Sequence, residues 1–245
     1  MKYVGSKARI AKYIVPIIQQ YLEAHGRSKY VEPFVGGANI ITQIKHPVRL
    51  GTDNSLPLIK LLHHVTFGGG GLPQAISKEH YDEVRKHPEN YYDWYVGAVG
   101  YLASYNGKYF GGYAGTVHTK AGTVRDYYDE AKRNLEAQAK ILQASPPVFM
   151  HADYRQLSDM FKDGLTDALI YADPPYEGTT GYVDKFNSAE FWDTCRKWAN
   201  NGNTVLVSEL QAPPDFSCIW EKPVTRTLNH NDRSTTTEKL FIYKG

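Results

Sequence analysis

The stretch LIYADPPYEGTTGY, residues 169–182, joins an apolar run to an aspartate, two prolines and a tyrosine. An apolar run of this length is typical of a buried strand. Because proline has no backbone N–H and a fixed φ, the strand must end near Asp173. The motif therefore sets a carboxylate, two rigid residues and an aromatic ring at the end of a strand. A plain strand end followed by a turn has the same local pattern, so the rest of the chain has to decide.

Three other short apolar runs also end in a carboxylate, at Glu32, Asp53 and Asp153. Between the strands we expect helices over 6–25, where Pro16 should kink or divide the helix, and over 54–65, 127–143 and 188–202, where Ser188 is a plausible cap. A glycine turn at 35–37 should run into a further helix up to residue 44. Residues 203–210 read as a strand, and 218–228 and 238–245 as a closing antiparallel pair. This alternation predicts an α/β fold with a mostly parallel sheet and one antiparallel strand near the C-terminus.

Residues 57–145 interrupt this alternation. The glycine run at 68–71 opens a segment rich in tyrosine and glycine, which reads as helices joined by long loops. The sequence therefore predicts a sheet domain made of 1–56 and 146–245, with a largely helical insertion at 57–145.

Composition places the chain among globular proteins. It has 245 residues, of which 42% are hydrophobic and 22% charged, and a net charge of +2 that neither requires nor excludes a nucleic-acid partner. Cys195 and Cys218 have no spacing typical of a zinc site or a disulfide framework, so we predict a reducing compartment and no metal. No signal peptide or membrane-spanning stretch is evident, which predicts a soluble cytoplasmic protein.

The acidic strand ends point to a ligand. In open α/β sheets, ligands bind beyond the carboxyl ends of the strands. Gly36 and Gly37 form a turn there, but neither a GxGxxG motif nor a phosphate loop is present, which disfavours a pyrophosphate. Asp53 follows this turn by roughly twenty residues, the usual place of a carboxylate that binds a ribose. A ribose with a cationic tail describes S-adenosylmethionine. Each carboxylate could instead cap a helix or form an Asx turn.

Five motifs occur in a telling order: YVGSK (3–7), EPFVGG (32–37), TDN (52–54), ADY (152–154) and DPPY (173–176). Together they resemble the class α, Dam-like N6-adenine DNA methyltransferases of phages and bacteria. The resemblance implies a Rossmann-like methyltransferase sheet with a target-recognition insertion. Many relatives have GGK where this chain has GSK, with Ser6, but the spacing to Lys7 is kept.

The resemblance also implies roles for individual residues. The cofactor residues would be Tyr3, Lys7, Glu32, Phe34, Gly36, Asp53, Asp153, Tyr154 and Asp173. The catalytic residues would be Asp173, Pro174, Pro175 and Tyr176. The Asp173 carboxylate and the Pro174 carbonyl would accept the hydrogens of the adenine amino group, and Tyr176 would stack on the flipped base. Outside this family, Tyr3 and Lys7 would be read as ordinary surface residues.

The insertion is the expected DNA-binding part. Residues 94–125 contain no acidic residue, and their basic side chains are interleaved with aromatic residues and glycines. SYNGKYFGGY (104–113) resembles the family segment that approaches DNA. The DNA-binding candidates are Tyr105, Asn106, Lys108, Tyr109, Lys120 and Arg125. A packed tyrosine-rich subdomain is the alternative. Residues 229–239 read as a polar hairpin loop, where Arg233 could touch a phosphate but is more simply explained as solvated.

The leading hypothesis is N6-adenine methylation of DNA, taken as duplex, with the target base flipped into the DPPY pocket. The alternatives are an N4-cytosine or RNA methyltransferase and a DNA-binding relative that has lost catalysis. A nucleotide-dependent dehydrogenase is remote because the GxGxxG turn is missing. A companion restriction endonuclease would be compatible with the hypothesis. The recognition sequence and the oligomeric state are not encoded in any pattern that we can read.

Overall fold

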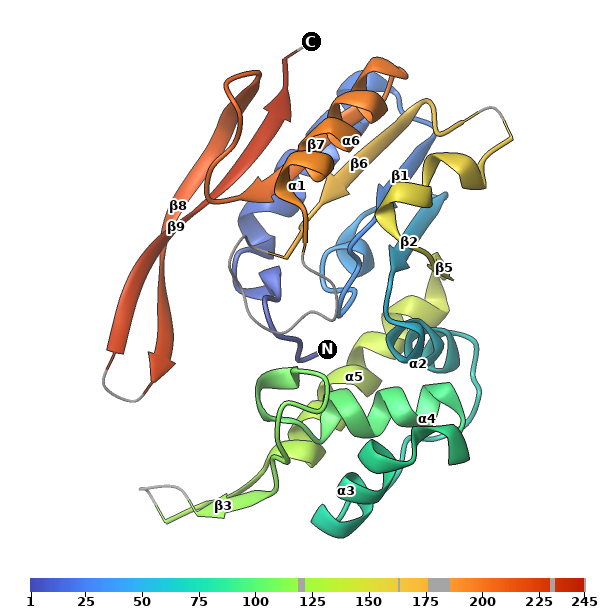
Figure 1. Cartoon of the computed structure of the whole chain (residues 1–245), viewed down its shortest axis with the longest axis vertical. Coiled ribbons are helices and arrows are strands. Elements are labelled where there is room, and N and C mark those ends of the chain that lie inside the picture. Colours follow the sequence, from blue (N-terminus) through green and yellow to red (C-terminus); the bar gives the residue numbers. More distant parts are fainter. Residues whose placement is uncertain (119–121, 163, 176–185, 230–231, 245) are drawn as a thin grey trace.

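The computed structural model describes residues 1–118, 122–162, 164–175, 186–229 and 232–244, with the backbone alone at 225–229 and 232–234. The fold is mixed α/β around one seven-stranded sheet (Figure 1). Among the described helices, none combines the length and the apolar character that crossing a bilayer requires.

The sheet has the strand order β5-β2-β1-β6-β7-β9-β8. Its strands are β1 (Lys29–Glu32), β2 (Arg49–Asp53), β5 (Val148–His151), β6 (Ala168–Ala172), β7 (Thr204–Glu209), β8 (Phe216–Asn229) and β9 (Asp232–Tyr243). The first five are mutually parallel; Val31 of β1, for example, is in register with Leu50 on one side and with Ile170 on the other. β9 runs antiparallel to both β7 and β8. The predicted fold class is confirmed.

The first third of the chain differs from expectation in two places. Pro16 does not divide the first helix: α1 (Ala11–His25) continues through it, with Pro16 on the exposed face, and the turn before it is a 3-10 helix (Lys7–Arg9). After the glycine turn, only a 3-10 turn forms (Ile41–Gln43) in place of the expected helix. Gly36 and Ala38 both have positive φ, which prevents a helix from starting earlier.

The helical part between β2 and β5 contains α2 (Leu56–Thr66), α3 (Lys78–Lys86), α4 (Asp93–Gly97), a π-helical turn (Ala98–Leu102) and α5 (Tyr127–Ala144). It also contains a short exposed hairpin, β3 (Thr116–His118) and β4 (Val124–Asp126), which was not predicted and which projects from the helices (Figure 1).

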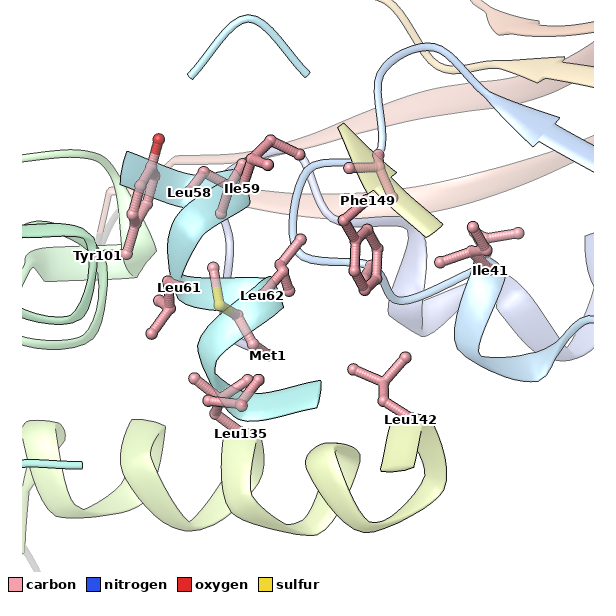
Figure 2. Packing of buried hydrophobic residues seen from close by; sticks show 14 of the residues in the cluster. Met1, Ile41, Leu58, Ile59, Leu61, Leu62, Tyr101, Leu135, Leu142 and Phe149 are labelled. Atoms are coloured by element: carbon pink, nitrogen blue, oxygen red, sulfur yellow. The ribbon is translucent and has the colours of Figure 1, made fainter. Parts of the chain in front are cut away.

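The sheet and the helical part share one hydrophobic core. Figure 2 shows α2 lying between α5 and the sheet, with Leu62 of α2 close to Leu142 of α5 and to Phe149 of β5. The side chain of Met1 is buried in the same cluster, near Leu135. This shared core ties the start and the end of the helical part to the sheet. The division of the chain at residues 57 and 145 remains a prediction.

The C-terminal third differs from expectation in two details. α6 (Ser188–Asn200) is capped by Asn187, whose side chain accepts a hydrogen bond from the backbone N–H of Glu190, and not by Ser188. Most of the segment 229–239, predicted to be a loop, is strand, because β9 begins at Asp232. Its run of serine and threonines has a high strand propensity although it carries no apolar alternation.

Candidate active site

A cleft of about 1320 Å³ lies at the carboxyl ends of β1, β2 and β6. All nine residues predicted to hold the cofactor line it: Tyr3, Lys7, Glu32, Phe34, Gly36, Asp53, Asp153, Tyr154 and Asp173. Pro174 and Pro175 line it too, whereas Tyr176 lies outside the described residues. The strand ends and the N-terminal segment are thus brought to one place, as the topology requires.

The two glycines of the connection that follows β1 make room for Tyr3. Gly36 has a φ of +47°, and a Cβ on it would lie 2.9 Å from the Tyr3 ring. A Cβ on Gly37 would lie 2.9 Å from the Cβ of Tyr3. The Tyr3 ring also stacks on Tyr101, with centroids 5.7 Å apart. The close approach predicted for this turn is therefore made, at least in part, by the chain's own N-terminal segment.

Glu32 is a buried carboxylate at the end of β1, with 3% of its surface exposed. It accepts a hydrogen bond from the Tyr30 hydroxyl. Burial raises the pKa of Glu32 from its ordinary value of 4.5 to about 8, and the nearby Asp173 charge adds to this shift. The Tyr30 hydrogen bond and the Arg49 charge oppose it. Glu32 is therefore mostly neutral at pH 7, unless a cation binds beside it.

Asp53 occupies the equivalent place at the end of β2. Its two carboxylate oxygens accept hydrogen bonds from the backbone N–H groups of Gly36, at 3.1 Å, and Ser55, at 3.0 Å. Burial raises the pKa of Asp53 to about 6, against the lowering effect of these hydrogen bonds. Each carboxylate oxygen can still accept a further hydrogen bond from a ligand hydroxyl.

Asp173, at the end of β6, is bound by Lys7. The Lys7 ammonium lies 2.8 Å from the Asp173 carboxylate and 3.5 Å from the Glu238 carboxylate. Lys7 is 6% exposed, so this cation is buried between carboxylates at the floor of the cleft. Lys7 was predicted to hold a cofactor; the structure pairs it with the predicted catalytic residue.

An aromatic cluster forms one wall of the cleft. Phe34 packs on Tyr154, with centroids 5.1 Å apart, and edge-on against Phe186 and Phe191. Asp153 caps the 3-10 turn that begins at Tyr154. This wall suits a flat, partly apolar ligand group.

Comparison with known proteins identifies the family. The sequence matches the profile of the D12 class N6 adenine-specific DNA methyltransferase over residues 3–214. The chain belongs to this family. No curated protein sequence matches the methyltransferase.

Among solved structures, one similar protein is the rRNA methyltransferase aviRa from Streptomyces viridochromogenes. The alignment covers 96% of the present chain and 84% of the aviRa chain, at 14% identity and a TM-score of 0.47. A putative RNA methyltransferase from Pyrococcus horikoshii aligns with 96% of this chain and 81% of its own, at 8% identity and a TM-score of 0.41. A putative methylase from Haemophilus influenzae aligns with 98% of this chain and 88% of its own, at 9% identity and a TM-score of 0.36.

Asp153 of the methyltransferase is paired within its own turn. The Arg155 guanidinium binds both Asp153 oxygens, each at 2.8 Å, and this pairing holds the pKa of Asp153 below its ordinary value. The alternative reading of Asp153 as a helix cap is thus correct for its local structure, and the residue also faces the cleft.

The predicted DNA-binding residues separate into groups. Lys108 and Tyr109 reach the cleft, and the turn that holds them packs on the N-terminal segment, where a Cβ on Gly107 would lie 2.5 Å from the Lys2 carbonyl oxygen. Arg125 lies on the exposed β3–β4 hairpin and is bound by both oxygens of Glu130, at 2.7 and 2.9 Å. The other candidates are Tyr105 and Asn106, which are exposed, and Lys120, which lies outside the described residues.

Sequence reasoning missed several cleft residues of the methyltransferase. Phe186, Asn187 and Glu190 line the cleft from the start of α6. The available signal was the start of this helix, where Ser188 was predicted to be a cap and no cleft residue was predicted. Glu238 had no local signal, because it is 231 positions from Lys7 in the chain and only the sheet brings the two together.

Proposed function

We propose that this methyltransferase transfers a methyl group from S-adenosylmethionine to the N6 amino group of adenine in DNA, with the target base flipped into the cleft. The observation that carries the proposal is the Lys7–Asp173 ion pair at the end of β6, directly before two prolines that line the same cleft. Family membership supports adenine as the base, and a cleft at the carboxyl strand ends is where this architecture binds its ligands.

The proposed chemistry is positioning together with electrostatics. The lone pair of the adenine amino nitrogen is delocalised into the ring, so the nitrogen is a poor nucleophile. The Asp173 carboxylate and the Pro174 carbonyl would accept its two hydrogens and draw the lone pair toward the methyl group. The proline pair keeps the carbonyl in place, and Lys7 keeps the carboxylate in place. Good orientation of this kind is worth roughly 7–11 kcal/mol of the barrier.

The residues of the cleft fit S-adenosylmethionine, which would supply an activated methyl group. Glu32 is a buried carboxylate that gains from a cationic partner, as the ligand's ammonium would be. Asp53 keeps acceptor capacity for a ribose diol. The Phe34–Tyr154 wall suits an adenine ring. These three elements are the ones that we assign to cofactor binding.

The position of Asp173 supports the proposed flipping of the base. Its carboxylate is at the floor of the cleft, 19% exposed, and a base stacked inside a duplex could not reach it. Tyr176 remains the predicted stacking partner. We assign phosphate contact to Lys108 at the cleft and to the projecting β3–β4 hairpin (Figure 1).

The test is transfer of a labelled methyl group to duplex DNA. Asp173→Ala removes the acceptor, and Asp173→Asn removes its charge; each should slow transfer by ~100-fold or more, the cost of one preorganised polar contact. Asp159→Ala is the matched control and should transfer normally, because Asp159 is exposed and forms no ion pair with any residue that the structure describes. Tyr176→Phe should be mild and Tyr176→Ala damaging, because stacking needs the ring. Near-normal transfer by Asp173→Ala would refute the proposal.

A further inference from the structure

Glu238 is a buried carboxylate close to the predicted catalytic residue. It lies on β9, is 5% exposed, and places one oxygen 3.5 Å from the Lys7 ammonium. It does not line the cleft itself. The ion pair with Lys7 is the contact that links Glu238 to the predicted catalytic residue.

We propose that Glu238 is a positioning residue for methyl transfer: it holds the Lys7 ammonium from the side away from the substrate and shares its charge, so that Asp173 stays a strong acceptor. This inference rests on the proposed function. It adds a residue from the C-terminal hairpin, which none of the motifs at the strand ends includes.

The physical reason lies in the needs of a buried ammonium. Lys7 has three N–H donors and is almost fully buried, so it needs several acceptors. Without Glu238, the cation would draw more electron density from the Asp173 carboxylate, which must accept the adenine hydrogens. A second carboxylate beside Lys7 compensates part of its charge, so less electron density is drawn from Asp173. It also favours the charged form of Lys7 and fixes the direction of its side chain.

Several other charged or titratable groups surround this site, and they stay in place when Glu238 is changed. On the Asp173 side, they are Glu32 and Tyr30 of β1, Arg49 of β2 and Tyr171 of β6. On the Glu238 side, Lys222 of β8 is its cross-strand neighbour, and both Lys222 and Lys12 of α1 lie against the Tyr13 ring. A change in pH dependence after substitution of Glu238 therefore reports the loss of its own charge.

The hairpin offers a matched control. Glu221 lies on β8 and pairs with Lys239 at 3.8 Å, and its side chain is 61% exposed. Glu238→Gln and Glu221→Gln each remove one negative charge from the same two strands. Only the first removes it from Lys7.

The experiment measures kcat, cofactor affinity, DNA affinity and the pH dependence of kcat for both variants. We expect Glu238→Gln to lower kcat by about tenfold or more, the scale known for side chains that orient metal-binding residues. Both affinities should stay at wild-type values. The acid limb of the kcat profile should move to lower pH, because loss of the Glu238 charge leaves the Lys7 charge less compensated, which lowers the pKa of Asp173. Glu221→Gln should match the wild type throughout.

Three results would overturn the inference. The first is a wild-type kcat in Glu238→Gln. The second is a lower kcat with an unmoved acid limb, which would indicate a merely structural role. The third is a wild-type kcat in Glu238→Asp, which keeps the charge but withdraws it from Lys7 by one methylene. This variant tests the positioning role if Glu238→Gln does not fold. If the wild type itself does not methylate adenine in DNA, the proposed function fails instead.

Discussion

Neutralising Glu32 should change how both folding and cofactor binding depend on pH. The pKa of Glu32 is about 8 in the folded chain against an ordinary 4.5, and at ~1.4 kcal/mol per pH unit this shift corresponds to about 5 kcal/mol. Its sign follows from the direction of the shift. Below pH 4.5 Glu32 is mostly protonated in both the folded and the unfolded chain, so the shift costs no stability. As the pH rises toward 8, the unfolded chain ionises first, so stability falls across this window. Glu32→Gln should remove that part of the slope.

The same residue should couple proton release to cofactor binding. At pH 7 Glu32 is protonated in the free enzyme, and pairing with the ammonium of S-adenosylmethionine requires the carboxylate. Binding should therefore release close to one proton (~0.9), and apparent affinity should rise by up to about tenfold per pH unit below pH 8. Tyr30→Phe removes a hydrogen bond that lowers the pKa of Glu32, so it should move this dependence to higher pH.

Titration calorimetry at pH 7 in phosphate and in Tris measures the released protons from the difference in binding enthalpy. The wild type should show the release, and Glu32→Gln should show almost none and bind with little dependence on pH. Equal proton counts in the two proteins would refute the assignment of Glu32 as the partner of the cationic tail. Denaturant unfolding at pH 5.5 and pH 8 gives an independent check on the stability slope.

Three further predictions concern the cleft and the insertion. Gly36→Ala should weaken cofactor binding and lower the melting temperature, because the new Cβ would sit on a backbone of positive φ and only 2.9 Å from the Tyr3 ring. Calorimetry measures the affinity and thermal unfolding the melting temperature; unchanged values would contradict the packing described. Asp53→Ala should weaken S-adenosylmethionine binding by about tenfold or more through loss of a buried acceptor, and wild-type affinity by calorimetry would exclude Asp53 as the ribose partner. Lys108→Ala should weaken DNA binding and reduce its salt slope by about one. Arg125→Ala should have a smaller effect, because Arg125 is already bound by Glu130. Equal effects of the two variants in a salt titration would show that the Arg125–Glu130 pair opens on DNA.

The sheet was predictable because its strands carry strong local signals. Asp173 is followed by two prolines and Asp53 by an Asx turn, so both strand ends and the shared edge of the sheet follow from the sequence. The first connection misled us, because the pattern after Gly37 has a helical period while the positive φ at Ala38 delays any helix. The β3–β4 hairpin was missed because its residues are exposed on both faces, which leaves no alternation to read.

The sequence predicted which residues line the cleft but not which of them form ion pairs with one another. The motifs placed Lys7 and Asp173 in one cleft, but nothing local to either residue indicates a contact between them or with Glu238. Contacts between residues so far apart in the chain depend on how β6 and β9 are ordered in the sheet. Arg125 is a similar case: the acid-free run predicted a free cation, while the glutamate that binds it lies just beyond that run.

Identification of the methylated nucleoside is the decisive test of adenine methylation in DNA. Duplex DNA and ribosomal RNA would each be incubated with the purified enzyme and labelled S-adenosylmethionine, digested to nucleosides and separated. The proposed function predicts label in N6-methyladenine from DNA, lost in Asp173→Ala and retained in Asp159→Ala. Label in N4-methylcytosine, or label in RNA and not in DNA, would contradict it.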